Sequence, residues 1–220
     1  MIQVSTSILT LDKEDAVKTF YDLEVAHTDM FHIDIMDGKF VEKDTRELMK
    51  DFSLTLSHIT NLGLDVHLMV ENIEEYIDEY IELEPEYITF HIEASKTKER
   101  TMENINLIKE NGIKVGLSIN PDTSIEEIKE YIPYVHMILV MTVVPGKGGQ
   151  KLIPETLEKI SELKKYIDEN GFDIDIQADG GINGETAKSV REAGANILVS
   201  GSYILNSENL KEAILSLKNN

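Results

Sequence analysis

Two histidines and two aspartates stand at the ends of short apolar runs, where they could bind a metal ion or move a proton. His32 and Asp34 close one such run. His67 lies near the end of the next run, and Asp179 follows a later one. Imidazole nitrogens and carboxylate oxygens are metal ligands, and a carboxylate can also act as a general acid or base. Because the chain contains no cysteine, a metal site must be built from these two residue types.

The spacing within the first run decides which of its side chains share a face. Side chains alternate along a β-strand, so His32 and Asp34 would point to one side, with Ile33 and Ile35 on the other. A single inward-facing histidine is more often a hydrogen-bonded core residue than a metal ligand. The functional interpretation therefore depends on whether the fold brings these polar residues together.

Short β-branched runs alternate with longer charged, amphipathic segments along the whole chain, which is typical of a parallel sheet with helical crossovers. Eight such pairs are present. The expected strands span residues 2–8, 30–35, 64–69, 87–91, 114–119, 135–141, 173–178 and 196–200. The clearest helical segments span residues 12–26, 73–83, 101–111, 156–170 and 184–193. Four glycines that precede strands, where a helix could end, are Gly63, Gly112, Gly171 and Gly194.

The pattern favours an α/β fold of one domain, a closed (β/α)8 TIM barrel covering residues 1–220. That length fits eight strand–helix units, and no linker divides the chain. An open, doubly wound sheet also alternates strand and helix, but its nucleotide-binding form carries a glycine-rich turn after the first strand. The residues that follow the first strand here do not form such a turn.

In a closed barrel, the ends of the strands meet at one mouth, where catalytic groups gather. Two histidines and two aspartates there would bury charge without a partner unless a cation neutralises it. The set His32, Asp34, His67 and Asp179 therefore predicts a divalent metal site. Mixed imidazole and carboxylate ligands suit Zn²⁺, Fe²⁺ or Mn²⁺ better than Ca²⁺ or Mg²⁺.

The charge composition limits the classes of partner. The chain has 41 acidic and 21 basic residues, a formal net charge of -20, which disfavours nucleic acid and anionic membranes. An anionic substrate would need a local site made of backbone amides and helix N-termini. No apolar run reaches the roughly 18 residues of a membrane span, and the first residues do not form a signal peptide. We expect a cytoplasmic protein.

Five motifs, in order along nearly the whole chain, carry a family resemblance. They are a Ser-Ile-Leu sequence near the start and the segments at 32–38, 65–70, 141–150 and 179–183, which read HIDIMDG, DVHLMV, MTVVPGKGGQ and DGGIN. The chain thus resembles the ribulose-phosphate 3-epimerases. The resemblance implies a barrel of the ribulose-phosphate-binding type and an isomerase of the pentose phosphate pathway. Its reaction would convert D-ribulose 5-phosphate to D-xylulose 5-phosphate at C3 through an enediolate.

The resemblance also assigns roles to individual residues. The metal ligands would be His32, Asp34, His67 and Asp179, and the two aspartates would also serve as acid and base on opposite faces of the sugar. The strand after residue 86 ends in His91-Ile92-Glu93, similar to a family strand end, with no ligand role assigned. The implied substrate-binding residues are Ser7, Met36, Met69, Met141, Gly146, Lys147, Gly148, Gly149, Gly180, Gly181, Gly201 and Ser202.

Apart from Ser7, which ends the first strand, these substrate-binding residues fall into three groups. The methionines would cover the reacting part of the sugar with thioether groups, although methionine also fills cores. The glycines around Lys147 would form a lid, for which an ordinary loop is the alternative. The pairs after the seventh and eighth strands would bind phosphate on backbone amides.

Residues expected at the rim of the barrel mouth depart from the family pattern, so the resemblance alone does not decide which sugar phosphate is the substrate. Glu42 and Lys43 stand where Pro-Asn is usual, and Lys147 stands where Phe is usual. D-allulose 6-phosphate is an alternative substrate, and a non-catalytic sugar-phosphate-binding barrel is an alternative function. A Schiff-base aldolase would need a lysine inside the barrel, whereas Lys114 begins its strand. We also expect a homo-oligomer, as closed assemblies are common among soluble enzymes.

Overall fold

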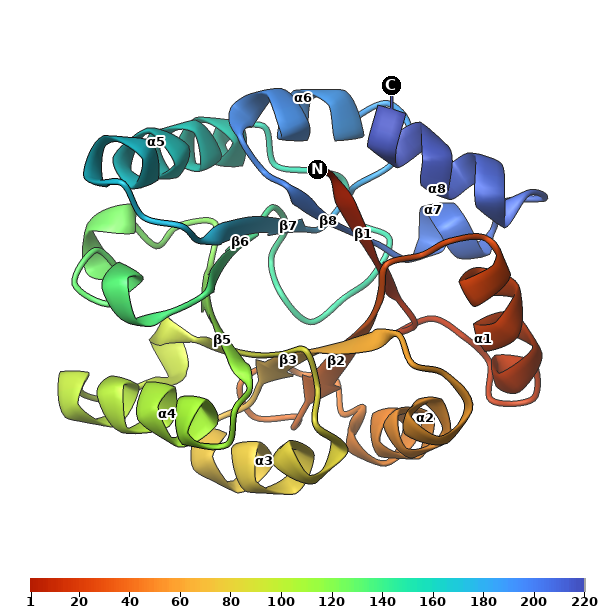
Figure 1. The fold of residues 1–220 in the computed structure, drawn as a ribbon, viewed down its shortest axis with the longest axis horizontal. Coiled ribbons are helices and arrows are strands. Elements are labelled where there is room, and N and C mark those ends of the chain that lie inside the picture. The colour runs from red at the N-terminus through yellow and green to blue at the C-terminus, as the bar shows by residue number, and fades with distance from the viewer. Residues whose placement is uncertain (220) are drawn as a thin grey trace.

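Eight parallel strands close into a barrel in the order in which they occur along the chain (Figure 1). The computed structural model describes residues 1–219. The strands are β1 (Gln3–Ser7), β2 (Met30–Met36), β3 (Gly63–Met69), β4 (Tyr87–His91), β5 (Lys114–Ile119), β6 (Met137–Met141), β7 (Asp175–Asp179) and β8 (Ile197–Ser200). β8 pairs with β1, so the sheet has no free edge. The TIM barrel expected from the sequence is confirmed, and an open doubly wound sheet is excluded.

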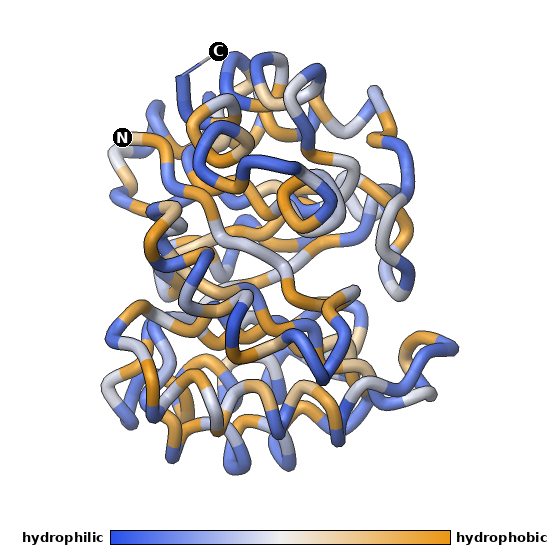
Figure 2. The backbone as a smooth tube through the Cα atoms, turned by 90° about the vertical axis from the view of Figure 1, so that its right-hand side faces the viewer, coloured by the Kyte–Doolittle hydropathy of each residue, from blue (hydrophilic) through white to orange (hydrophobic). Residues whose placement is uncertain are grey.

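Helices surround the barrel on the outside (Figure 1). They are α1 (Ala16–Val25), α2 (Arg46–Ile59), α3 (Ile73–Tyr80), α4 (Lys98–Glu110), α5 (Glu155–Asn170), α6 (Ala187–Ala193), α7 (Ser202–Leu205) and α8 (Leu210–Asn219). The main apolar core lies between strands and helices and includes the outward-facing Ile33 and Ile35 of β2. Figure 2 shows hydrophilic residues along the outer turns and hydrophobic ones towards the middle of the molecule.

The crossover between β5 and β6 differs from the expected strand–helix alternation. Within the described residues it contains two short 3-10 helices, Ile125–Glu127 and Ile132–Tyr134, and no α-helix. Pro133 lies in the first turn of the second one. Proline has no amide hydrogen and clashes with the preceding turn of an α-helix, so it disfavours a longer helix here.

Some expected boundaries also shift. β6 and β7 begin two residues later than expected, and Asp179 is the last residue of β7 rather than the residue after it. Gly63 is the first residue of β3, and α2 ends earlier, at Ile59, so Gly63 does not cap that helix. Gly171 does end α5, with a left-handed φ of 69°.

The pairing of strands sets which side chains share the lumen. In the register of β2 and β3, His32 lies beside Asp65 and Asp34 beside His67. All four side chains are buried. Among residues 1–219, no helix combines the length and apolar character that crossing a bilayer requires.

Candidate active site

The four polar residues expected to bind a metal converge in the structure. Each offers one ligand atom, and these atoms all lie within 4.8 Å of one another. Asp34 Oδ1 is 3.3 Å from His32 Nε2 and 3.3 Å from His67 Nδ1. Asp179 Oδ2 is 3.9 Å from His32 Nε2 and 3.8 Å from His67 Nδ1. They come from β2, β3 and β7, so only the closed barrel unites them.

His32 is held from behind by a buried carboxylate. Its Nδ1 lies 2.7 Å from Asp65 Oδ2, which also accepts hydrogen bonds from Ser5 Oγ at 2.7 Å and Gln177 Nε2 at 2.6 Å. The opposite nitrogen, Nε2, is buried and has no hydrogen-bond partner among the described residues. This arrangement fixes the ring and presents Nε2 to the centre of the cluster.

The carboxylates of the cluster have opposite pKa shifts. Burial raises the pKa of Asp34, but His32 and His67 outweigh it, and the net shift is downward. Burial and the nearby carboxylates, Asp34 foremost, raise the pKa of Asp179 to about 7 despite the attraction of His32. Burial lowers the pKa of His32, but Asp34 and Asp65 outweigh it and hold the pKa well above the usual value. The cluster therefore attracts positive charge at its centre.

The donor set fits a divalent transition-metal ion. Metal–ligand bonds of about 2.0–2.2 Å place the ligand atoms of a tetrahedral site roughly 3.3–3.6 Å apart. The shortest separations in this cluster are 3.3 Å and all are within 4.8 Å, so small shifts would bring the four atoms onto one ion. The unpartnered Nε2 of His32 and the carboxylate oxygens around it supply the lone pairs. The supporting carboxylate behind His32 is the usual outer partner of a metal-bound imidazole.

A cavity of about 630 Å³ opens above this cluster. Asp34 and Asp179 reach its wall, whereas His32 and His67 lie beneath them, fully buried. The structure brings every expected substrate-binding residue to this one cavity. They are Ser7, Met36, Met69, Met141, Gly146, Lys147, Gly148, Gly149, Gly180, Gly181, Gly201 and Ser202.

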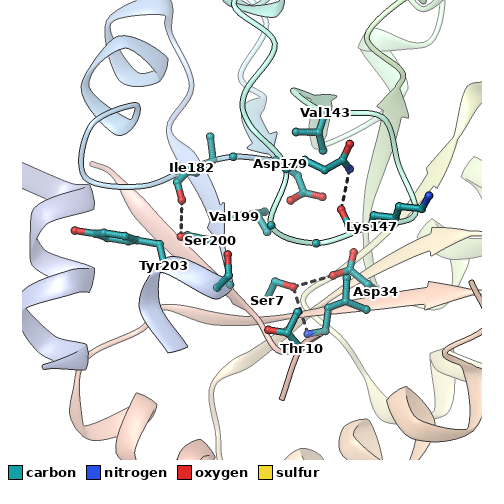
Figure 3. Close-up of a pocket in the computed structure, with 18 of the residues that line it drawn as sticks. Ser7, Thr10, Asp34, Val143, Lys147, Asp179, Ile182, Val199, Ser200 and Tyr203 are labelled. Atoms are coloured by element: carbon teal, nitrogen blue, oxygen red, sulfur yellow. Dashed lines mark hydrogen bonds between the residues drawn. The ribbon is translucent and has the colours of Figure 1, made fainter. Parts of the chain in front are cut away.

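On one side of the cavity, Ser7 contacts the cluster directly. Its hydroxyl donates to Asp34 Oδ2 at 2.8 Å (Figure 3), which leaves Oδ1 facing the two histidines. Met36, Met69 and Met141 are almost fully buried and surround the cluster from three strands. Because Met141 pairs with Asp179 in the register of β6 and β7, its side chain shares the inner face.

The glycines after β7 and β8 allow the backbone to approach closely. A Cβ at Gly181 would lie 2.3 Å from the Leu152 nitrogen, and one at Gly201 would lie 2.9 Å from the Ser7 oxygen. The short helix α7 begins at Ser202, on the same wall of the cavity (Figure 3). Any side chain at Gly181 or Gly201 would collide with backbone, so only glycine fits both positions.

The glycine-rich loop after β6 crosses the middle of the barrel (Figure 1). Gly146 packs against Val41, and Gly148 packs against Thr10. The Gln150 side chain fastens the loop by donating to the Val144 and Lys147 carbonyl oxygens at 2.7 and 2.8 Å.

The side chain of Lys147 extends away from Asp179 and Ser7 in Figure 3. Its Nζ lies 4.0 Å from Glu42, and both side chains are largely exposed. The two departures from the family pattern at the rim therefore face each other.

Comparison with known proteins identifies the family. The family model described as "Ribulose-phosphate 3 epimerase family" matches residues 3–205. The chain belongs to the ribulose-phosphate 3-epimerase family. It is 41% identical over 218 residues to the ribulose-phosphate 3-epimerase of Methanocaldococcus jannaschii, covering 99% of this chain and 90% of that protein. It is 40% identical over 220 residues to the ribulose-phosphate 3-epimerase of Bacillus subtilis, covering 99% of each.

A solved structure supports the fold at lower sequence identity. The 3-hexulose-6-phosphate synthase of Salmonella typhimurium superposes with a TM-score of 0.70 at 13% identity, covering 98% of this chain and 96% of that one. The family membership makes the chain an isomerase. Lys114 is exposed at the start of β5 and pairs with Glu86, so it has no place in a Schiff-base mechanism.

Sequence reasoning missed several residues that support the site of this epimerase-family chain. Asp65 holds His32, and Gln177 holds Asp65. Thr142 donates to the Gly180 oxygen at 2.5 Å and so ties the end of β6 to the loop after β7. Asp65 lies two residues before His67 on the same strand, so strand alternation could have placed it in the lumen. Gln177 lies two residues before Asp179 and carried the same signal, whereas Thr142 carried none.

The pKa shifts predict how metal affinity depends on pH. A metal ion must displace any proton from its ligands, and the pKa of Asp179 is raised to about 7. Zn²⁺ affinity should therefore fall as the pH is lowered from 8 to 5, by about tenfold per pH unit for each proton displaced. Competition with a chromophoric chelator measures this. Asp179→Asn should reduce the slope, and identical slopes in both proteins would contradict the assignment.

Proposed function

We propose that this chain catalyses the metal-dependent epimerisation of D-ribulose 5-phosphate to D-xylulose 5-phosphate at C3. The observation that carries the proposal is the placement of Asp34 and Asp179 on β2 and β7, with their carboxylates meeting at the base of one cavity. The named epimerases of M. jannaschii and B. subtilis support this substrate.

Inversion at a carbon beside a ketone requires removal of a proton from one face and delivery of a proton to the other. Asp34, with its lowered pKa, is the base in one direction. Asp179, which reaches the same cavity from β7, would deliver a proton from the other face. In the reverse direction the two residues exchange roles. Ser7 keeps the Asp34 carboxylate oriented by its hydrogen bond to Oδ2.

The metal would be held by the two imidazoles and the two carboxylates of the cluster. Zn²⁺, Fe²⁺ and Mn²⁺ all suit these ligands. When bound, such an ion polarises the ketone oxygen and stabilises negative charge that develops there. The methionines exclude water around the reacting carbon, because their buried thioethers line the cavity beside the aspartates.

The phosphate would bind on the opposite wall, at the backbone of Gly180, Gly181, Gly201 and Ser202. The net charge of -20 repels an anionic substrate at long range, so the local amides and the start of α7 must supply the attraction. The loop from Gly146 to Gly149 would close over the sugar. Residues 1–220 would act as one domain, and the absence of cysteine suits a reducing compartment such as the cytoplasm.

Replacing either aspartate by asparagine should abolish epimerisation. General acid–base groups contribute about 10²–10⁴-fold, so Asp34→Asn and Asp179→Asn should each lose at least that factor in kcat. Deuterium incorporation at C3 from D₂O measures proton transfer, and metal content is measured in parallel. Asp173→Asn, an exposed residue shortly before β7, is the control. Wild-type turnover in either active-site variant would exclude that residue as a base. A sugar-phosphate sensor would instead show no turnover in the wild type.

The rim should influence the choice of sugar. The exposed pair Lys147 and Glu42 stands at the edge of the cavity, and an exposed charge contact is worth about 0.2–1 kcal/mol. Lys147→Phe should therefore change the ratio of kcat/KM for D-ribulose 5-phosphate over D-allulose 6-phosphate by roughly 1.4- to fivefold. Glu42→Gln breaks the pair from the other side and serves as a comparison. An unchanged ratio in Lys147→Phe would remove Lys147 from substrate selection.

We also propose self-association through α1. Val17, Tyr21 and Val25 are 49%, 49% and 75% exposed and follow one another at helical spacing. Leu54 and Leu215, on the neighbouring α2 and α8, are exposed as well. Exposed apolar side chains on three adjacent helices would form an interface if a second copy covered them.

Light scattering should find more than one subunit in the wild type, and Tyr21→Glu should shift the protein towards the monomer. Tyr134→Glu changes an exposed tyrosine elsewhere and is the matched control. A monomeric wild type at assay concentrations would refute the interface.

A further inference from the structure

A row of hydrogen bonds runs outward from His67, away from the metal cluster. His67 Nε2 lies 2.9 Å from His91 Nε2, and His91 Nδ1 lies 3.2 Å from Glu93 Oε2. The two rings are 23° from parallel with centroids 5.0 Å apart, so they meet edge to edge through these nitrogens. Both histidines are fully buried, and Phe40 packs against His91 with ring centroids 4.9 Å apart. The row thus links a metal ligand to a carboxylate through one imidazole.

Glu93 is fixed at the outer end of this row. It follows β4 in the 3-10 helix Ile92–Ala94, and its side chain is 22% exposed. Its other oxygen, Oε1, accepts hydrogen bonds from the Asn120 amide at 2.7 Å and from the Thr123 hydroxyl. Burial raises the pKa of Glu93, but the donors around it, His91 foremost, outweigh burial and lower the pKa. Glu93 is therefore an ionised acceptor with a fixed orientation.

One proton between the two facing nitrogens determines the protonation of both rings. If His67 Nε2 carries it, His67 Nδ1 has a free lone pair towards the cluster. His91 Nε2 then accepts, and His91 Nδ1 carries a proton that it donates to Glu93. If His91 Nε2 carries it instead, His67 Nδ1 is protonated and donates to Asp34, 3.3 Å away, and cannot bind a metal. In that second arrangement, the lone pair of His91 Nδ1 would face the Glu93 carboxylate.

We propose that Glu93, acting through His91, selects the tautomer of His67 whose Nδ1 is free to bind the metal. Glu93 is a positioning residue in this role, and it resembles Asp65, which contacts His32 Nδ1 directly. Each imidazole of the cluster is thus backed by its own carboxylate, one in direct contact and one through a second ring. The inference rests on the metal site of the proposed function.

Glu93→Gln should reverse the direction of hydrogen-bond donation along this row while leaving the side chains in the same positions. The amide oxygen must face the Asn120 amide, which can only donate, so the NH₂ group faces His91 Nδ1. His91 Nδ1 then becomes an acceptor, its Nε2 carries the proton, and His67 Nδ1 is protonated. Loss of an outer partner of a metal-bound histidine costs about 10–100-fold in affinity, and we expect a Zn²⁺ affinity reduced by that factor.

Two measurements test the inference, neither of which depends on turnover. The first is Zn²⁺ affinity by chelator competition in wild type, Glu93→Gln and the control Glu86→Gln, which removes the same charge just before β4. The second is long-range ¹H–¹⁵N correlation of the imidazoles in the metal-free wild type, because a bound metal ion would itself impose the tautomer of His67. We expect the proton of His91 on Nδ1 and that of His67 on Nε2.

The outcomes separate this inference from the proposed function. A wild type that binds no Zn²⁺ would overturn the metal site itself. A wild type that binds Zn²⁺ while Glu93→Gln binds it equally well would overturn only the role of Glu93. A proton on Nε2 of His91 in the metal-free wild type would also overturn the role of Glu93, even if Glu93→Gln failed to fold. A Glu93→Gln defect with an unaffected Glu86→Gln supports the inference.

Discussion

The mutual repulsion of carboxylates inside the barrel is the constraint on which the site depends. Asp34, Asp65 and Asp179 all point into a lumen where burial of an unpaired ion costs several kcal/mol. His32 lies between Asp34 and Asp65, with nitrogens 3.3 and 2.7 Å from their oxygens. Charge therefore alternates across the lumen. In the proposed function, a cation between Asp34 and Asp179 would complete this alternation, and the same two residues would then serve as acid, base and metal ligands.

The same constraint explains the polar residues behind the ligands. A carboxylate such as Asp65 can remain ionised in the interior because Ser5, Gln177 and His32 donate to it. Glu93 remains ionised at the outer edge through donors from the crossover between β5 and β6. These outer residues would neither bind the metal nor transfer a proton to the substrate. They lower the cost of keeping two imidazoles in fixed orientation beneath an open cavity.

Sequence reasoning predicted those parts of the structure that follow from local pattern. Strand alternation placed His32 and Asp34 on one face, and the strand–helix alternation predicted the barrel that brings Asp179 to them. It could not predict the contact between Gln177 and Asp65, because these residues are 112 positions apart and meet only when the barrel closes. The two 3-10 segments before β6 were missed for a different reason. The stretch that contains them is apolar and acidic and therefore resembles an amphipathic α-helix, but Pro133 disfavours such a helix.

The segment that follows the glycine-rich loop is tied to β6 and to the loop after β7. The Ile153 amide donates to the Thr142 oxygen at 2.8 Å, and Leu152 lies against Gly181 without room for a side chain. Any closing movement of the loop would therefore be confined to the residues before Leu152, and the backbone at Gly181 would stay in place. A substitution in this loop, such as one at Lys147, can therefore change what faces the cavity from above without moving the backbone beside Asp179.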